Sequence, residues 1–287
     1  MPIPEGQAII DTMIGFPKKD YAVYDFIRAQ TKDAASNEME FPAEYMFKNV
    51  PKELYGTSAD PIDVTIGEMD RFNITHGLIG VRADGYNEAF ERYPDRFVAA
   101  ASIDPNDIMG ALREIEGCHE KYPLRAVTAF PSGCNPQVPI DDRRFYAVYA
   151  KCVELDLPIF VCAGIPGPRL PFAPQEVARI DQVMYDFPEL TFVTRHGCEP
   201  WEELAVKLML KWPGLHYSTS AFAPKHYPKA IIDYANTRGS DKVLYAGYFP
   251  MGLSLDRIMG DMADVAFKDE VWNKFLYANA ARILKLD

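Results

Sequence analysis

Several side chains that can do chemistry stand directly after short apolar runs of this sequence. They are Arg82 in GVRADG, Cys162 in FVCAG, Arg195 and His196 in FVTRHG, and Tyr248 in YAGYFP. A histidine titrates near neutral pH and can move protons, and a phenol can donate a hydrogen bond to a developing oxyanion. A guanidinium can clamp a carboxylate or phosphate through two hydrogen bonds. These residue types predict acid/base chemistry assisted by stabilisation of negative charge.

His196 is the candidate acid/base group, and its structural alternative is a histidine kept by packing and hydrogen bonding. Adjacent residues of a strand point to opposite faces, so Arg195 and His196 are not expected to enter the same space. We expect Arg195 between strand and helix or at a rim, in a structural ion pair with Glu199 or another carboxylate. Arg195 and Glu199 are nevertheless included as candidate substrate-binding residues.

Tyr248, Arg82 and Cys162 each have a functional and a structural interpretation. Tyr248 could stabilise an oxyanion or only fill volume, and Arg82 could orient an anionic substrate or form a surface salt bridge. Cys162 could act as a nucleophile if His196 lowered its pKa. A cysteine at a buried strand end is more often an inert, small apolar residue, so we favour a role for Cys162 in the substrate pocket only.

These side chains need a scaffold, and short apolar runs alternate with amphipathic stretches along the chain. The runs are rich in β-branched and aromatic residues, as is typical of strands buried on both faces. Eight strands are predicted, at residues 8–15, 77–82, 97–103, 126–130, 158–163, 190–196, 215–220 and 243–248. Helices are predicted at residues 62–72, 87–93, 107–121, 143–155, 174–187, 201–211, 228–236, 254–265 and 271–284, the last as two short helices.

The alternation predicts an α/β protein with a parallel sheet, and eight strands favour a closed (β/α)8 TIM barrel over an open sheet. No GxGxxG follows the first strand, which would have favoured the open sheet. We expect one domain over residues 1–287. Residues 18–61 interrupt the rhythm after strand one, and are predicted to form an insertion or lid at the C-terminal face. An ordinary surface excursion is the alternative.

Apolar residues near the predicted strand ends indicate an apolar pocket wall, formed by Met13, Phe130, Phe222 and Phe249. Asp11 lies two residues before Met13, so that both side chains share one face of strand one. We expect a buried Asp11 carboxylate near the barrel interior, with a structural role supported by hydrogen bonds.

Composition narrows the class of protein. Of the 287 residues, 48% are hydrophobic and 25% charged, which is ordinary for a globular protein with a sizeable core. The net charge of −11 and the lack of a Lys/Arg-rich run argue against nucleic-acid binding. No apolar run reaches the length of a membrane span. Five cysteines without a CxxC pair predict a reducing compartment, so we expect a cytoplasmic protein.

At the strand ends the sequence resembles the amidohydrolase-2 family, the branch of the amidohydrolase superfamily similar to aminocarboxymuconate-semialdehyde decarboxylase. The resemblance covers nearly the whole chain and follows the order of that family. Its phrases are ERYPDRFVAAASIDP for strand three, ELDLPIFVCAG for strand five, FPELTFVTRHGCEPW for strand six, DKVLYAGYFP for strand eight and NAARILKLD for the terminal helix. It implies a barrel fold and a homodimer.

The resemblance also implies a divalent metal, most often zinc. The family holds it with a His-x-His pair after strand one, a histidine ending strand five and an aspartate ending strand eight, while a histidine ending strand six is a ligand or acid/base group. Here Met13 and Gly15 replace the pair, Cys162 replaces the strand-five histidine and Tyr248 replaces the aspartate, so that only His196 matches. Because a zinc site needs at least three protein ligands, we predict no catalytic metal and no other cofactor.

The substrates that the resemblance implies are small carbonyl-bearing or aromatic carboxylic acids. We therefore expect a metal-independent hydrolase or carbon–carbon lyase, of the hydrolytic, decarboxylating or retro-Claisen type, acting on a small carbonyl-bearing acid or thioester. In this hypothesis His196 activates water or shuttles a proton, Tyr248 stabilises the oxyanion and Arg82 orients the anionic end. One alternative is a non-catalytic barrel that binds a ligand or partner. Another is an unusual metal site formed by Cys162, His196 and His226.

Overall fold

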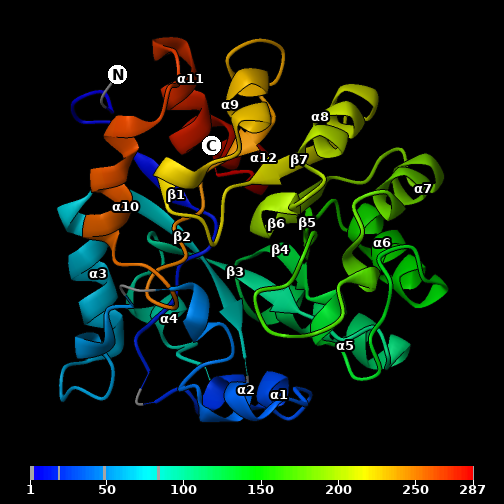
Figure 1. Cartoon of the computed structure of the whole chain (residues 1–287), viewed down its shortest axis with the longest axis horizontal. Helices are drawn as coiled ribbons and strands as arrows, with labels where there is room; N and C mark the ends of the chain where they lie inside the picture. The colour runs from blue at the N-terminus through cyan, green and yellow to red at the C-terminus, as the bar shows by residue number, and fades with distance from the viewer. Residues whose placement is uncertain (1–2, 19, 48–49, 83–84, 287) are drawn as a thin grey trace.

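The barrel predicted from the alternation of strands and helices is confirmed in the structure, a computed structural model that describes residues 3–18, 20–47, 50–82 and 85–286. Eight parallel strands lie in chain order, each paired with the next, and helices surround them (Figure 1). The strands are β1 (Ile9–Asp11), β2 (Ile74–Val81), β3 (Phe97–Ser102), β4 (Leu124–Ala129), β5 (Ile159–Cys162), β6 (Phe192–Arg195), β7 (Leu215–Ser218) and β8 (Val243–Leu244).

The helices begin where the sequence supplies side-chain caps. Asp107, Asp142 and Ser254 each accept a hydrogen bond from a backbone N–H in the first turn of the helix that follows. The helices are α1 (Asp25–Arg28), α2 (Ala34–Glu38), α3 (Pro61–Arg71), α4 (Ala89–Arg92), α5 (Ile108–Lys121), α6 (Arg143–Glu154), α7 (Arg179–Asp186), α8 (Glu202–Lys211), α9 (Lys229–Ala235), α10 (Leu255–Asp261), α11 (Asp269–Asn273) and α12 (Asn279–Leu284).

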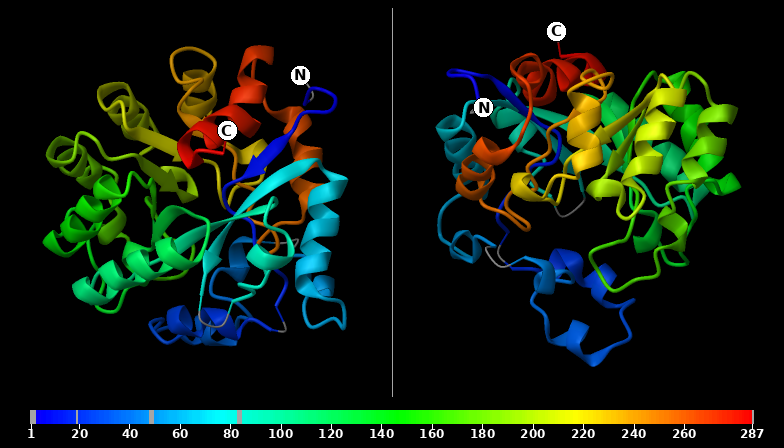
Figure 2. Two further views of the ribbon diagram at one scale, coloured as in Figure 1. Left: turned by 180° about the vertical axis from the view of Figure 1, so that it is seen from behind. Right: turned by 45° about the horizontal axis from the view of Figure 1, so that its top comes forward.

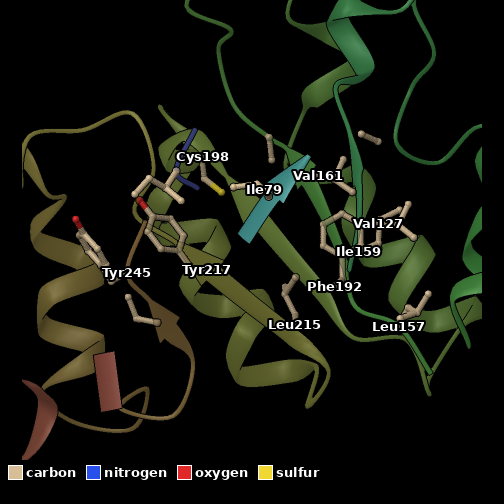
Figure 3. Close-up of a cluster of buried hydrophobic side chains, with 14 of the residues drawn as sticks. Ile79, Val127, Leu157, Ile159, Val161, Phe192, Cys198, Leu215, Tyr217 and Tyr245 are labelled. Atoms are coloured by element: carbon tan, nitrogen blue, oxygen red, sulfur yellow. The ribbon is translucent and has the colours of Figure 1, made fainter. Parts of the chain in front are cut away.

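Alternate residues of the strands fill two separate cores. The outer core lies between strands and helices and includes Ile79, Val127, Ile159 and Phe192 (Figure 3). The inner core fills the barrel with the neighbours of these residues along the same strands, and α12 closes it at one end (Figure 2). The inner side chains are Ile10, Leu78, Val98, Ala100, Ala126, Phe160, Val193 and Leu244, joined by Ala280, Ala281, Ile283 and Leu284.

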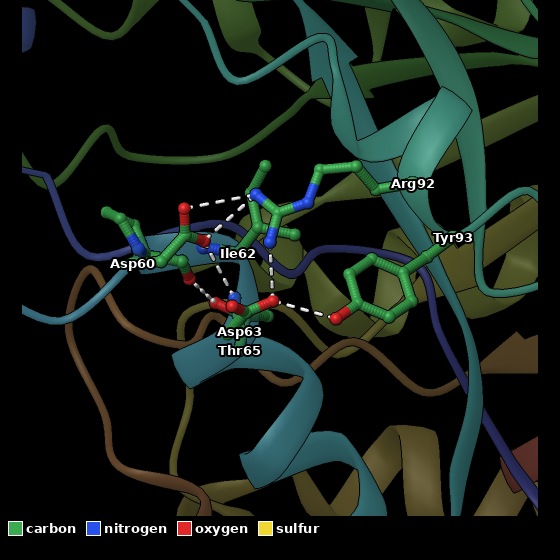
Figure 4. Close-up of polar contacts among 7 residues, drawn as sticks. Asp60, Ile62, Asp63, Thr65, Arg92 and Tyr93 are labelled. Carbon is green, nitrogen blue, oxygen red and sulfur yellow. Dashed lines mark hydrogen bonds and ion pairs between the residues drawn. The ribbon is translucent and has the colours of Figure 1, made fainter.

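The segment between β1 and α3 leaves the barrel at the end opposite α12, and the right panel of Figure 2 shows it in blue. Positions 19, 48 and 49 of this segment lie outside the described residues. The chain returns to the barrel at Asp60, which caps α3 by accepting from Ile62 N and Asp63 N at 2.9 and 3.0 Å. Arg92 holds both carboxylates, to Asp60 at 3.0 Å and to Asp63 at 2.6 Å (Figure 4).

The seam between β8 and β1 is closed by loop contacts and by one buried carboxyl group. Asp11 Oδ1 accepts from Met13 N at 2.9 Å and from Gly247 N at 2.8 Å, and Tyr248 N donates to Met13 O at 2.9 Å. Ile10 fills the barrel, so Asp11 points to its outer side, not to the interior that the sequence suggested. Asp11 therefore joins the two strand ends that carry Met13 and Tyr248.

No described helix is long and apolar enough to cross a membrane. All five cysteines are buried and unpaired. Burial raises the pKa of Cys152 and Cys198 to about 12, so both thiols stay protonated at neutral pH.

The buried Asp11 predicts a pH-dependent stability. Burial raises its pKa to about 6, with Gly247 N–H and Met13 N–H opposing the shift. A folded-state pKa above the unfolded one stabilises the fold below about pH 4, and this contribution is lost as pH rises through 6. Asp11→Asn keeps an acceptor oxygen but carries no charge. We expect the stability of the wild type relative to this variant to fall by up to about 3 kcal/mol between pH 4 and pH 7 in urea unfolding. A constant difference across this range would contradict the buried ionisation.

Candidate active site

A cavity of about 1390 Å³ lies at the C-terminal ends of the strands. The strand ends and the loops after them form one side of the cavity, which we call its floor. Residues 24–47, which we call the covering segment, form the wall opposite the floor. Nine of the ten candidate residues line the cavity, namely Met13, Arg82, Phe130, Cys162, Arg195, His196, Glu199, Phe222 and Tyr248.

Phe249 is the candidate that the structure places elsewhere. Its side chain is 2% exposed and belongs to the outer core, not to the cavity wall. β8 ends at Leu244, and Tyr248 adopts a left-handed backbone with φ of 66°. Nearness to a predicted strand end, on which Phe249 was assigned to the pocket wall, therefore does not place its side chain at the cavity.

Arg195 is the inward-pointing residue at the end of β6. It is 9% exposed, its Nη2 donates to Thr12 O at 3.1 Å, and its guanidinium lies 5.0 Å from the centre of the Phe160 ring. Its Nε has no hydrogen-bond partner, and no described carboxylate, Glu199 included, forms an ion pair with it. Burial lowers the pKa of Arg195 to about 10, so it remains charged at neutral pH. In place of the expected structural ion pair, the structure has a buried cation beside the cavity that only the more distant Asp11 carboxyl group attracts.

His196 lines the same cavity as Arg195, although alternation predicted opposite faces. β6 ends at Arg195, and a left-handed turn follows, with φ of 67° at His196, 86° at Gly197 and 61° at Cys198. This turn brings the His196 ring back over the mouth of the barrel. Gly197 is required there because a Cβ would lie 2.3 Å from the Phe222 ring.

The His196 ring is held between a hydroxyl and a phenol. Its backbone N–H donates to Ser220 Oγ at 3.1 Å, and the same Oγ lies 3.2 Å from Nδ1. The Tyr248 ring meets the imidazole edge-on, with ring centres 5.3 Å apart. Burial, followed by the Arg195 charge, lowers the pKa of His196 to about 3. His196 is therefore a neutral imidazole at physiological pH.

Tyr248 connects the floor of the cavity to its cover. Its ring centre lies 5.7 Å from that of Phe47 in the covering segment. The residue also lines the cavity. Burial raises the pKa of Tyr248, while Arg195 opposes the shift, so the phenol keeps its proton and can donate it in a hydrogen bond.

Cys162 and Glu199 are protonated more readily than free side chains of their types. Burial raises the pKa of Cys162 to about 12, which leaves a neutral thiol and agrees with the inert role favoured above. Glu199 is half-buried, and burial followed by the Glu202 charge raises its pKa. Glu199 is thus a carboxyl group whose affinity for protons is increased at the cavity wall.

Sequence reasoning missed two hydroxyl groups at the cavity. Ser102 Oγ and Thr128 Oγ1 lie 3.0 Å apart at the ends of β3 and β4, and both residues line the cavity. Small hydroxyl residues follow many strands and have no distinctive motif. The alternation of side chains along β3 could have indicated Ser102, because it points to the same side as the inner residues Val98 and Ala100.

The donor set does not fit the metal that the family resemblance implies. Among the residues that the structure describes, no group of three His, Cys, Asp or Glu side chains is placed to hold a metal ion, and this includes Cys162, His196 and His226. Asp11 lies on the outer side of the barrel and is occupied by two N–H groups. The cationic Arg195 lies at the floor of the cavity, where it would repel a divalent ion.

Known structures share this fold over nearly the whole chain. An uncharacterized TIM-barrel protein from Bordetella bronchiseptica is 22% identical, with a TM-score of 0.75, and the match covers 97% of this chain and 98% of that one. 2,6-Dihydroxybenzoate decarboxylase from Rhizobium is 16% identical, with a TM-score of 0.67, and the match covers 98% of this chain and 99% of that one. A probable 2-pyrone-4,6-dicarboxylic acid hydrolase from Acinetobacter baumannii is 13% identical, with a TM-score of 0.66, and the match covers 96% of this chain and 99% of that one. At these identities the likeness establishes the fold only.

No curated protein matches the sequence significantly. The amidohydrolase family, in contrast, matches residues 29–286, which include β2 to β8 and every candidate residue except Met13. This is the family that the strand-end phrases resembled. The chain belongs to the amidohydrolase family.

Proposed function

We propose that this protein is a metal-independent hydrolase or carbon–carbon lyase that acts on a small carbonyl-bearing acid or thioester. The observation that carries the proposal is the buried Arg195 guanidinium at the cavity, which forms no ion pair and whose Nε has no hydrogen-bond partner. A buried charge without a partner is costly, so the site is arranged to receive negative charge. A carbonyl oxygen that becomes an oxyanion during the reaction supplies such a charge.

His196 supports the proposal as a hydrogen-bond donor. Ser220 Oγ accepts the His196 backbone N–H, so the serine proton is left to point at Nδ1. Nδ1 is then the acceptor, and the ring proton is assigned to Nε2. A neutral imidazole donating through Nε2, together with the Tyr248 phenol and the Arg195 guanidinium, gives three donors for one oxyanion. This role replaces the water activation that the sequence suggested for His196.

Glu199 can supply the base that His196 no longer provides. In the proposed step its carboxylate takes a proton from water, the water oxygen bonds to the carbonyl carbon, and the π electrons move to the oxygen that the three donors face. Collapse of this intermediate breaks the carbon–carbon or carbon–sulfur bond. The leaving carbanion or thiolate then takes the proton from Glu199, and the other product is a carboxylic acid. Direct decarboxylation of a β-keto acid needs the same three donors but no base.

Arg82 is the group proposed to orient the anionic end of the substrate. It is exposed and lines the edge of the same cavity, whereas Arg195 is buried at the floor. Two arginines at different depths suit a substrate with a reacting carbonyl and a separate carboxylate.

Replacing the buried cation should abolish most turnover. Arg195→Met preserves an unbranched, apolar side chain beside Phe160 but removes the charge. We expect kcat to fall at least about 100-fold, because one oxyanion donor is worth that much. The measurement is product formation by chelator-treated enzyme with a panel of β-keto acids, β-diketone acids and acyl thioesters. Arg143→Gln, an exposed residue on α6 away from the cavity, is the matched control and should leave kcat unchanged.

The same assay separates the alternatives. Activity that disappears with chelator and returns with zinc would overturn the metal-free proposal. Binding of carboxylic acids without turnover of any panel member would favour the non-catalytic barrel.

The tautomer of His196 gives a second prediction. We expect the ring nitrogens to report a neutral imidazole protonated at Nε2 from pH 5 to pH 8, because burial and Arg195 hold its pKa at about 3. Nitrogen-15 NMR of labelled histidine measures both properties. Ser220→Ala removes the donor to Nδ1 and should mix the two tautomers, whereas Ser132→Ala, at a buried serine bonded to Pro171 O outside this network, should not. A histidine that titrates near pH 6.5 in the wild type would argue for the acid/base role instead.

A further inference from the structure

The size and lining of the cavity say more about the substrate than the donor set does. We infer that the natural substrate carries, beyond its acidic head, an extended apolar body that lies along the covering segment. The inference rests on the proposed function for the position of the head group. It goes beyond that function by naming the class of molecule, a carboxylic acid with a long apolar tail.

The volume is the first observation. The cavity measures about 1390 Å³, and pockets for drug-sized ligands span about 300–1,000 Å³. A small keto acid held by Arg195, His196 and Tyr248 would leave most of this space to water or empty. A larger ligand body is needed to fill it.

The second observation is the separation of polar and apolar groups. Most of the polar groups away from the edge gather on the floor, at the strand ends that carry Ser102, Thr128, Arg195 and Tyr248. The covering segment contributes the opposite wall, which is largely apolar and faces this floor. Its side chains are Phe26, Ile27, Phe41, Pro42, Ala43, Met46 and Phe47, together with the phenol of Tyr24.

The apolar wall continues beyond the covering segment. Ile165, Pro166 and Pro168, in the loop after β5, line the cavity next to it. The charged or titratable side chains of Arg82, Asp104, Glu114, Lys225 and His226 are exposed, so they mark the edge and not the wall. The half-buried Arg257 is ion-paired with Asp261 on its own helix. A ligand tail that leaves the floor therefore meets hydrocarbon before it meets solvent.

The third observation is that contacts with the barrel hold this wall in place. Tyr45 OH donates to Gly167 O at 2.6 Å, and Gln30 Nε2 donates to Gly133 O at 2.8 Å. A Cβ at Gly167 would lie 3.2 Å from Ala43 Cβ and 3.3 Å from Met46 Sδ, so the wall packs directly on this loop. The apolar surface is thus fixed at a distance from the floor and does not collapse onto it.

Straight-chain carboxylates test the inference, since each is a product analogue whose head suits Arg195. Binding of butanoate, hexanoate, octanoate and decanoate is measured by isothermal titration calorimetry. We expect affinity to rise about fourfold for each added methylene, the factor for a fully buried CH₂ group. Octanol should bind more weakly than octanoate to the wild type but equally to Arg195→Met. Affinity that stays constant from butanoate to decanoate would overturn the inference.

Matched variants locate the tail. Met46 and Ile165 line the cavity and are 51% and 53% exposed, so a glutamine at either position should be tolerated by the fold. Met46→Gln and Ile165→Gln should weaken decanoate binding several-fold while leaving butanoate binding unchanged. Met109→Gln, at a 54% exposed position on α5 outside the cavity, is the control and should change neither. Equal effects of all three substitutions would contradict a tail along this wall.

The outcome is separable from that of the proposed function. A chain-length dependence without turnover of any substrate supports the apolar tail and rejects the catalytic proposal. Turnover of short β-keto acids with no chain-length dependence in binding supports the catalytic proposal and rejects the apolar tail.

Discussion

The arrangement of the site depends on one positive charge that has been taken out of water without a directly paired carboxylate, since the buried Asp11 attracts it without forming an ion pair. The Arg195 guanidinium is held by a carbonyl and an aromatic face, neither of which neutralises it. Burial lowers the pKa of His196 and raises that of Tyr248, and the Arg195 charge adds to the first shift and opposes the second. Burial and Arg195 together therefore keep the imidazole neutral, while the Arg195 charge makes the floor attract anions and disfavours a metal ion in the same space.

Backbone geometry at the strand ends decides which side chains share that field. Within β6, alternation directs Arg195 inward. The left-handed residues that follow then return His196 to the same side, and the left-handed Tyr248 does the equivalent after β8. Such conformations are unfavourable for residues with a Cβ, so the surrounding contacts must hold them. The bonds from Ser220 to His196 and from Tyr248 to Met13 do this at the two positions.

The sequence predicted the barrel because hydrophobic periodicity reports burial, and all eight strands lie within or overlap the apolar runs. It also directed attention to most residues at the cavity, since strand ends meet at one face of a barrel. It failed where regular geometry ends. Asp11, Arg195 and Phe249 lie elsewhere than expected, and no motif marked Ser102 or Thr128. The left-handed turns and the missing ion pair of Arg195 are tertiary features, so no local pattern encodes them.

The two walls of the cavity come from different parts of the chain. The floor is built from the ends of strands whose register is fixed by the sheet, and a change there disturbs the barrel. The covering segment contributes no strand, and it is held to the barrel by side chains such as Gln30, Tyr45 and Phe47. Its exposed positions can therefore change without disturbing the register of the sheet. Evolution can alter which molecules such a protein accepts while the groups that react with them stay unchanged.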